Sequence, residues 1–387
     1  MTLWRPLQLL LPKKGFILLA ATAAGKRCLT QPRPRPMRGA RVGRRRVAIG
    51  GAAATLGCFG LSAFSLFSQE AEKEEEGGKG GEEEPKEAKQ EEAIIFLLKK
   101  AKLNIMKGEM EEAERILHEA ARMAQKAENT AGLIYTYDTM ANLALSRGQM
   151  EQAEKLFKAT MSHLLAGNMK EDDNAVLEIS LKLASIYAAQ NQDKLALAGY
   201  EFCILTLEEK VARQKDQPQD SLPEEERKDT RLLLGLSLDS YARFLLAWGR
   251  ASAAQKMYNR ALRIAAEEQG ETHPQTVVLM SDLATALDSQ GLYEEAYVQA
   301  KRAAELAKET EHPEAHIVLN NLAGILMHKE DYSGAKRVYH EALKRAEKSG
   351  DDATAKYIRK ELLELAKRRK RRSESSKEKS REEAGRQ

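Results

Sequence analysis

Residues 140–159, MANLALSRGQMEQAEKLFKA, decide the fold. Two small residues, Ala141 and Ala153, stand twelve positions apart, and Gly148 lies between them. Small residues at this spacing allow two helices to cross closely, and a glycine suits the left-handed end of the first helix. The stretch therefore predicts an antiparallel pair of helices joined by a tight turn.

This helix-pair pattern occurs six times within residues 93–348. The small residue of the second helix recurs at intervals of 40, 43, 58, 42 and 39, at Ala113, Ala153, Ala196, Ala254, Ala296 and Ala335. Its counterpart in the first helix is Ala101, Ala141, Ala184, Ala242, Ala284 or Ala323. The turn carries Gly108, Gly148, Asn191, Gly249 or Gly291, but Glu330 in the sixth unit, whose turn we expect to be built differently. Such repeats predict a stack in which each unit covers the apolar face of its neighbour.

The register of these units resembles that of the tetratricopeptide family. The clearest further units are LASIYAAQNQDKLALAGYEF at 183–202, LATALDSQGLYEEAYVQAKRAAEL at 283–306 and LAGILMHKEDYSGAKRVYHEAL at 322–343. Their length exceeds the usual ~34 residues and, with His-Pro at 273–274 and 312–313, resembles the units of kinesin light chains. The resemblance implies an all-α fold, a right-handed superhelix of antiparallel helix pairs with a disordered N-terminal leader and C-terminal tail.

The interval of 58 places an insertion at residues 208–231. Its charge and the prolines Pro218 and Pro223 predict lengthened helices joined by a protruding hairpin or loop. Insertions in repeat arrays map to functional loops, but a surface insertion is also tolerated at little cost, so both interpretations stay open. If the insertion binds a partner, the candidate contacts are Glu208, Arg213, Lys215, Glu225 and Arg227.

After the sixth unit, residues 353–367 predict a C-terminal capping helix with an apolar face. Residues 368–387 predict a charged tail, and the basic run KRRKRR at 367–372 also admits a nuclear-localisation interpretation. A solvated tail is the preferred interpretation, because the N-terminal region, described next, predicts import into mitochondria and not into the nucleus.

The N-terminal region predicts targeting to mitochondria. Residues 1–46 are rich in arginine and free of acidic residues, as in a mitochondrial transit peptide. Residues 47–67 carry no charge and are long enough for a transmembrane segment, although they also fit a removed end of the presequence. Residues 68–92 predict an acidic disordered linker. The flanking charges would place the repeats in the intermembrane space, on the inner membrane.

Charge and motifs exclude several function classes. Residues 1–69 hold twelve of the 62 Lys/Arg, which leaves 50 against 58 Asp/Glu, so the remainder is acidic and a poor nucleic-acid binder. No phosphate-binding loop, nucleophile elbow or zinc motif occurs, so we expect no catalytic, cofactor or metal site and no small-molecule substrate. We expect His312 and His316 to cap a helix or lie on the surface rather than to bind zinc. Cys203 is expected to be a buried free thiol.

Binding of other proteins is what the predicted superhelix offers. Positions three before and one after each first-helix alanine point into its concave groove. The polar candidates for protein binding at these positions are Asp138, Asn142, Ser185, Asp239, Arg243, Ser281, Thr285 and Asn320. This set lacks the basic clamp with which chaperone-binding members of the family hold a peptide carboxylate.

Within the family, three stretches resemble the mitochondrial members associated with respiratory complex III. They are TYDTMANLALSRGQMEQAEKLFKATMSHLL at 136–165, EISLKLASIYAAQNQDKLALAGYEFC at 178–203 and HPQTVVLMSDLATALDSQG at 273–291. The resemblance implies a non-catalytic inner-membrane protein that binds the cytochrome bc1 complex. There it would assist the turnover of fragments of the Rieske iron–sulfur subunit, with mitochondrial proteases as further partners. The alternative is a cytosolic cargo adaptor of kinesin-light-chain type.

Overall fold

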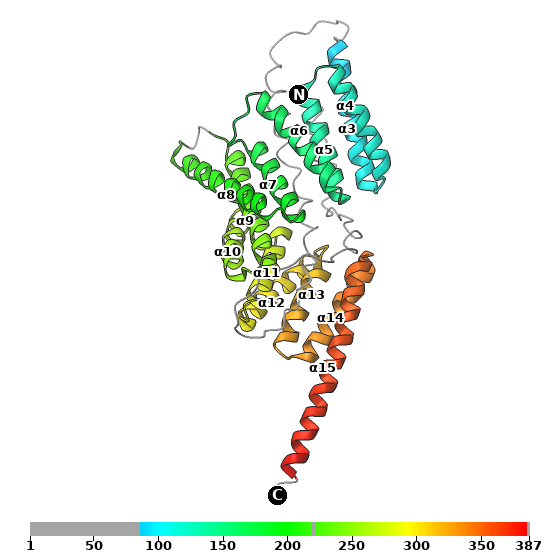
Figure 1. The fold of residues 1–387 in the computed structure, drawn as a ribbon, viewed down its shortest axis with the longest axis vertical. Helices are drawn as coiled ribbons and strands as arrows, with labels where there is room; N and C mark the ends of the chain where they lie inside the picture. Colours follow the sequence, from blue (N-terminus) through cyan, green and yellow to red (C-terminus); the bar gives the residue numbers. More distant parts are fainter. Residues whose placement is uncertain (1–85, 219–221, 385–387) are drawn as a thin grey trace.

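The computed structural model describes residues 86–218 and 222–384. In these ranges the chain forms thirteen α-helices and no β-strand, which confirms the all-α prediction. The first helices of the six pairs are α3 (Lys86–Lys107), α5 (Thr130–Ser146), α7 (Asn174–Ala189), α9 (Glu224–Ala247), α11 (Pro274–Asp288) and α13 (Ala315–His328). The second helices are α4 (Met110–Lys126), α6 (Met150–Ala166), α8 (Asp193–Asp216), α10 (Ala251–Gln269), α12 (Tyr293–Glu309) and α14 (Tyr332–Ser349). A final helix, α15 (Asp352–Ala384), packs on α14, and the pairs stack in chain order (Figure 1).

The helix crossings lie where the alanines predict them. All twelve marker alanines are buried, and none is more than 1% exposed. Ala184 of α7 shows how close the approach is, because a Cβ added to Gly199 of α8 would lie 2.8 Å from the Cβ of Ala184. A larger residue at either position would force the two helices apart.

The six turns within the pairs share one backbone conformation. Gly108 has a φ of 83°, and Asn191 has a φ of 60°, as the sequence predicts. The prediction of a different sixth turn is wrong, because Glu330 adopts a φ of 61°. Its amide donates to the carbonyl of Met327 at 3.3 Å, and the next amide donates to that of Leu326 at 3.0 Å. These are the bonds that end a helix in the left-handed conformation, so packing imposes on a glutamate a geometry that glycine adopts freely.

The apolar core is divided along the array. One continuous cluster extends from Leu177 of α7 to Leu365 of α15 and joins the third to sixth units. The first unit and the start of the second share a separate cluster around Ile116 and Leu117 of α4. A third cluster, around Phe157, joins α5 and α6 to the near face of α7. Helix α7 therefore carries two buried faces, one toward each part of the array.

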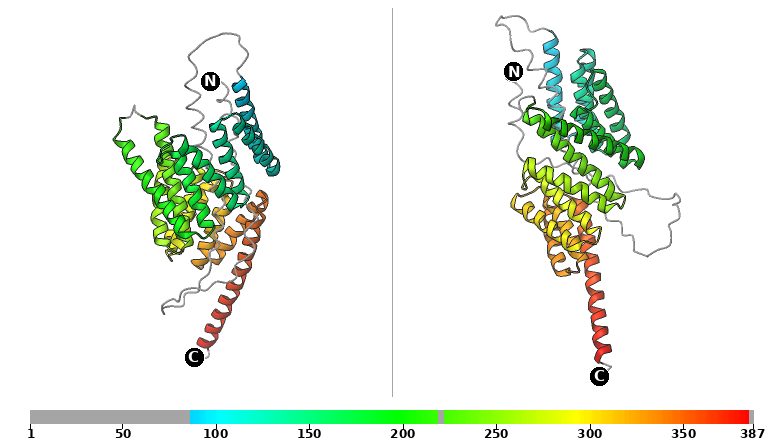
Figure 2. Two further views of the ribbon diagram at one scale, coloured as in Figure 1. Left: turned by 45° about the horizontal axis from the view of Figure 1, so that its top comes forward. Right: turned by 90° about the vertical axis from the view of Figure 1, so that its left-hand side faces the viewer.

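Both ends of the array differ from the predicted boundaries. Helix α3 begins at Lys86, within the segment expected to be a linker up to residue 92. Helix α15 continues to Ala384, past the expected end of the capping helix at 367, and projects beyond the other helices (Figure 2). Lys, Glu, Arg and Ala dominate both segments, and these residues have high intrinsic helix propensity. Because neither segment has an apolar stripe to bury, its periodicity gave no helical signal.

The predicted leader at 1–46 and apolar segment at 47–67 lie outside the described residues. Among the helices that the structure does describe, none has the length and apolarity needed to cross a bilayer.

Candidate protein-binding surface

The predicted groove residues lie on five successive first helices. Neighbouring first helices α7 and α9, and α11 and α13, contact each other directly. Side-chain ion pairs join α5 to α7 and α9 to α11, so the five helices form one wall. The candidates are Asp138 and Asn142 on α5, Ser185 on α7, Asp239 and Arg243 on α9, Ser281 and Thr285 on α11, and Asn320 on α13. Asp239 and Ser281 are buried, and the others are half-buried. The structure therefore brings the candidates onto one wall, but several of them are already engaged there.

Asp138 belongs to a buried charge cluster between the second and third units. The Nζ of Lys182 on α7 lies 3.3 Å from Asp138 Oδ1 and 3.0 Å from Glu178 Oε1, and its side chain is 1% exposed. Burial lowers the pKa of Lys182, but the two carboxylates outweigh burial and raise it above the ordinary value. Asn142 completes the cluster by donating to Asp138 Oδ2 at 2.9 Å. These groups hold α5 against α7.

Arg243 belongs to a second cluster, between the fourth and fifth units. Its Nε donates to Asp239 Oδ1 at 3.0 Å, and its Nη2 lies 2.7 Å from Asp282 Oδ2 on α11. Burial raises the pKa of Asp282 to about 6, assisted by the charges of Asp239 and Glu314 and opposed by Arg243. Because two carboxylates surround one guanidinium, Arg243 is neutralised within the wall and does not present a clamp for an acidic ligand.

The hydroxyl candidates are bonded within the wall as well. Ser185 donates to the carbonyl of Leu181 at 3.0 Å and accepts from Tyr200 Oη at 3.2 Å. Thr285 donates to the carbonyl of Ser281 at 3.1 Å, and Asn321 Nδ2 donates to Ser281 Oγ at 3.0 Å. These side chains consequently contribute more to the contact between units than to free binding capacity.

Asn320 is different from the other candidates. Its Oδ1 is buried and has no hydrogen-bond partner among the described residues. A buried acceptor without a donor costs about 1–3 kcal/mol, so a donor that reaches it when the half-buried side chain turns toward the groove would be rewarded. Of the predicted groove residues, Asn320 thus offers the clearest unused polar atom.

Three residues that pair across the wall were missed by sequence reasoning. Lys182, Asp282 and Asn321 each stand two positions before the first-helix alanine of their unit. Each contacts a groove candidate of the preceding unit. Lys182 contacts Asp138 and Asn321 contacts Ser281, both three positions before the alanine of their own unit. Asp282 contacts Arg243, one position after its alanine. The sequence does hold a signal for these three residues. Oppositely charged or hydrogen-bonding residues stand two positions before the alanine of one unit and at a groove position of the unit before it.

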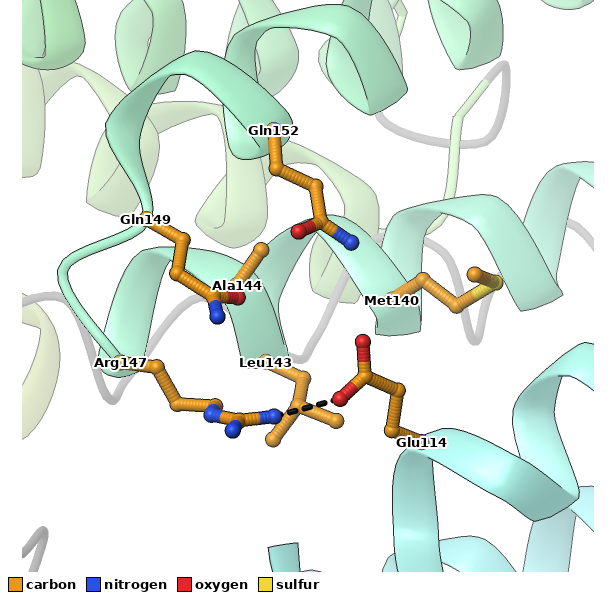
Figure 3. Close-up of a pocket in the computed structure, with 7 residues that line it drawn as sticks. All are labelled: Glu114, Met140, Leu143, Ala144, Arg147, Gln149 and Gln152. Carbon is orange, nitrogen blue, oxygen red and sulfur yellow. Dashed lines mark hydrogen bonds and ion pairs between the residues drawn. The ribbon is translucent and has the colours of Figure 1, made fainter. Parts of the chain in front are cut away.

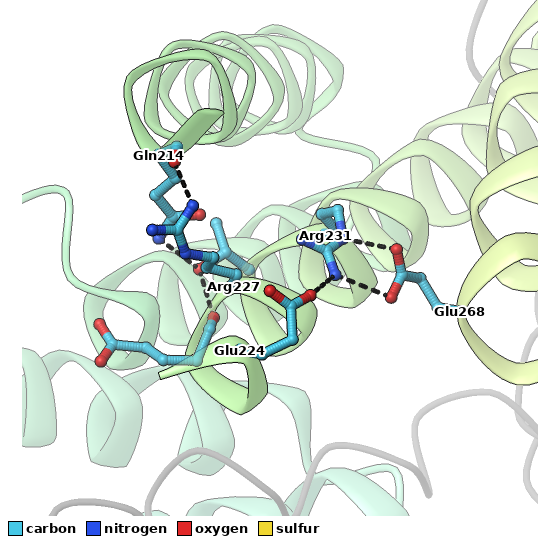
Figure 4. A network of polar contacts seen from close by, with 7 residues as sticks. Gln214, Glu224, Arg227, Arg231 and Glu268 are labelled. Atoms are coloured by element: carbon cyan, nitrogen blue, oxygen red, sulfur yellow. Dashed lines mark hydrogen bonds and ion pairs between the residues drawn. The ribbon is translucent and has the colours of Figure 1, made fainter. Parts of the chain in front are cut away.

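The insertion forms the ends of the two longest paired helices, α8 and α9. Arg227 is buried and donates to the carbonyl of Gln214 at 2.5 Å and to that of Pro218 at 2.7 Å, so it holds the hairpin together rather than facing a partner (Figure 4). Nearby, Arg231 Nε bonds Glu268 Oε1 of α10 at 2.5 Å.

The other predicted contacts of the insertion divide into engaged and exposed residues. Glu208 pairs with Arg260, and Arg213 Nη2 lies 2.6 Å from Asp172 Oδ2. Lys215 and Glu225 are exposed close to the connection between α8 and α9. Lys215 and Glu225 are therefore placed for contact with another molecule, as is Arg213, whose side chain is 60% exposed despite its ion pair.

His312, His316 and Asp173 bond to groups at the ends of helices. His312 accepts a hydrogen bond from the amide of Glu314 at 3.0 Å, and His316 Nε2 lies 3.1 Å from Asp351 Oδ2. Asp173 accepts from the amide of Ala175 at 2.9 Å, as expected of a short acid before a helix. The bond made by His312 agrees with the capping interpretation, but both histidines are buried, and His316 pairs with Asp351 instead of capping a helix. Within the described residues no group of three His, Cys, Asp or Glu is arranged to hold a metal ion.

Cys203 is a free, buried thiol, as predicted. Burial raises the pKa of Cys203 to about 12, so the thiol stays protonated and unreactive at neutral pH.

A hollow lies between α4, α5 and α6 (Figure 3). Glu114, Met140, Leu143, Ala144, Arg147, Gln149 and Gln152 line it. Arg147 Nη1 closes one side by pairing with Glu114 Oε2 at 2.5 Å. The hollow offers a volume of about 10 Å³, room for roughly one water molecule. Pockets for small organic ligands are about 300–1,000 Å³, so this hollow does not serve as one.

Comparison with known proteins agrees with the repeat architecture. Two models of the tetratricopeptide repeat match residues 234–309 and 318–349. Tetratricopeptide repeat protein 19, mitochondrial, of Homo sapiens is 55% identical over 311 residues, which cover 80% of this chain and 82% of that protein. The protein of the same name from Rattus norvegicus is 59% identical over 278 residues, covering 72% and 76%. The crystal structure of the apo form of RapI matches with a TM-score of 0.52 at 13% identity, covering 79% of each chain, and supports the fold alone.

Proposed function

Because this chain belongs to the family of tetratricopeptide repeat protein 19, mitochondrial, we propose that it is a non-catalytic protein-binding scaffold of the mitochondrial inner membrane that maintains respiratory complex III. It binds subunits of the cytochrome bc1 complex, including the Rieske iron–sulfur protein. By holding fragments of that subunit, it assists their turnover by mitochondrial proteases. The mitochondrial names of the relatives favour this role over that of a cytosolic cargo adaptor.

The wall of first helices supports a binding role. The stretches that resemble the complex III-associated members, at 136–165, 178–203 and 273–291, include most of α5, α7 and α11. They supply the first buried cluster and Asp282 of the second. Such clusters fix the wall, which is the preorganisation a binding surface needs. The proposal locates a binding contact at Asn320, because the Oδ1 of this side chain has no hydrogen-bond partner among the described residues.

The binding role is tested by complementation of cells that lack the protein. The full chain is restored as the wild type, as Asn320→Leu, or as Asn259→Leu, in which the same change is made at an exposed position of α10. Wild type and Asn259→Leu are expected to co-purify with complex III and to keep Rieske fragments low, whereas Asn320→Leu loses both.

Two outcomes would contradict the proposal at different levels. If the wild-type chain fails to co-purify with complex III, the assignment to that complex is wrong. If Asn320→Leu behaves like Asn259→Leu while the wild type co-purifies, binding occurs elsewhere than on the first-helix wall.

A further inference from the structure

The outer face of the last helix carries a row of lysines. Lys356, Lys360, Lys367 and Lys370 of α15 follow one another at intervals of four, seven and three residues. At about 100° per residue these intervals place all four within a narrow sector of one helix face. All four are exposed, and we call them, together with Leu363, the lysine face.

The lysine face points away from the array. Ala355, Ile358 and Leu365, on the other side of α15, are buried, none more than 2% exposed. They belong to the core cluster of the third to sixth units, so the contact of α15 with the array fixes the direction of the lysine face. Part of α15 also extends past the array (Figure 1), which leaves room for a large partner.

Three of the four lysines of this face carry an unpaired charge in the described part of the chain. Lys356, Lys360 and Lys367 have no ion-pair partner among the residues that the structure describes. Glu364 lies at the flank, half-buried, with its Oε1 3.6 Å from Arg368 Nε. Asp352 stands one turn before the first lysine, at the start of the helix.

An apolar side chain stands in the middle of this charged row. Leu363 lies between Lys360 and Lys367 and is 66% exposed, the largest exposed fraction among the large apolar residues of the described chain. An exposed leucine side chain is hydrated unfavourably, so burial of Leu363 in a partner would contribute favourably to the free energy of binding.

We propose that the lysine face of α15 binds the surface of a bilayer that contains anionic phospholipids. The straight row of cations, about 21 Å long at 1.5 Å per residue, matches a planar negative surface. Leucine side chains on a basic helix enter the boundary between head groups and acyl chains. The phosphates of a nucleic acid would attract the lysines but offer Leu363 no apolar environment, so the lipid surface accounts for both features.

The proposal does not depend on complex III or on a transmembrane segment. It predicts a contact that is sensitive to salt, because each lysine near an anionic membrane contributes by long-range attraction. About five-fold in partitioning is expected per lysine, and the four together contribute roughly two to three powers of ten.

The first test is a residue-resolved footprint on the full chain. The protein is mixed with vesicles of phosphatidylcholine alone, or of phosphatidylcholine with phosphatidylserine, and its lysines are acetylated by a water-soluble reagent. Lys356, Lys360 and Lys367 are expected to be protected only by the anionic vesicles. Lys194 and Lys256, exposed on α8 and α10, are expected to react equally in both samples.

Equal acetylation of the lysine face in both samples would overturn the proposal. Protection by polyglutamate or duplex RNA but not by anionic vesicles would also overturn it, and would identify an acidic polypeptide or a nucleic acid as the partner class. Because the readout is local, binding of the vesicles by another segment does not obscure it.

The second test compares two variants of equal charge. One replaces the four lysines of the lysine face by glutamine. The other replaces Lys155, Lys194, Lys256 and Lys336, four exposed lysines of second helices. The difference in partitioning between anionic and neutral vesicles should fall several hundred-fold in the first variant and several-fold or less in the second. A similar decrease in both would mean that net charge, and not the lysine face, attracts the membrane.

Discussion

Lys182 Nζ lies 3.3 Å from Asp138 Oδ1, across the boundary between the second and third units. Removal of a partner from a buried ion pair costs about 3–5 kcal/mol, because it leaves the other charge uncompensated. Lys182→Met keeps the length of the side chain and is expected to lower the free energy of unfolding by about that amount. Urea unfolding followed by circular dichroism measures the change.

The double variant Lys182→Met, Glu178→Gln serves as its control. Since it removes one of the two abandoned carboxylates, it should recover part of the lost stability. A double variant less stable than Lys182→Met would show that the buried charges are not the cause.

The pKa of Asp282 predicts a dependence of stability on pH. The folded carboxyl keeps its proton up to about pH 6, whereas an unfolded aspartate loses it near pH ~4. The native state therefore binds more protons between these values, and this group's contribution to stability falls as the pH rises from about 4 to about 6. Asp282→Asn should remove that decrease, worth about 1–3 kcal/mol, when unfolding by urea is compared at pH 4.5 and 7.5. An unchanged pH dependence in the variant would refute this assignment.

The tight crossing of α7 and α8 predicts opposite effects of one substitution at two glycines. Gly199→Ala should destabilise the fold by about 1–3 kcal/mol, because the new Cβ would overlap that of Ala184. Gly324→Ala, whose Cβ would lie 3.9 Å from Tyr339 Oη, meets no such obstacle and should gain up to about 1 kcal/mol from helix propensity. Thermal unfolding of the two variants checks both signs, and a stable Gly199→Ala would mean that the helices separate easily.

Backbone strain at a turn between units predicts a stabilising substitution. Glu311, exposed between α12 and α13, has a φ of 50°, which costs an L-residue about 1–2 kcal/mol. Glu311→Gly relieves that cost and should raise the melting temperature. Glu309→Gly, at the end of α12 without positive φ, should lower it slightly. Equal changes in the two variants would indicate that strain at 311 is negligible.

The sequence predicted the features that depend on local pattern. Ala141 and Ala153 could be recognised because small residues at helix crossings recur in every unit, and Gly148 because its turn needs a left-handed residue. Glu330 was misjudged because the packing of α13 on α14 fixes the turn whatever residue occupies it.

The state of the wall residues could not be read in the same way. Whether Asp138 or Arg243 is free depends on which side chain of the next unit reaches it, and that requires the rotation between units. Lys182 and Asp282 supply that contact from two positions before the alanine of their unit, which is not one of the positions predicted to line the groove. The lysines of α15 gave a charge run in the sequence, but their common direction required the packed face of the helix.

The division of the core has a consequence for how the array opens. Units three to six share one cluster, whereas the first two depend on smaller clusters that meet it through α7. In a linear array each unit is stabilised only by its neighbours, so local opening follows the weakest contacts. Amide hydrogen exchange should therefore proceed faster through α3–α6 than through α9–α13. The N-terminal units would act as a cooperative body of their own, able to loosen while the rest keeps its shape.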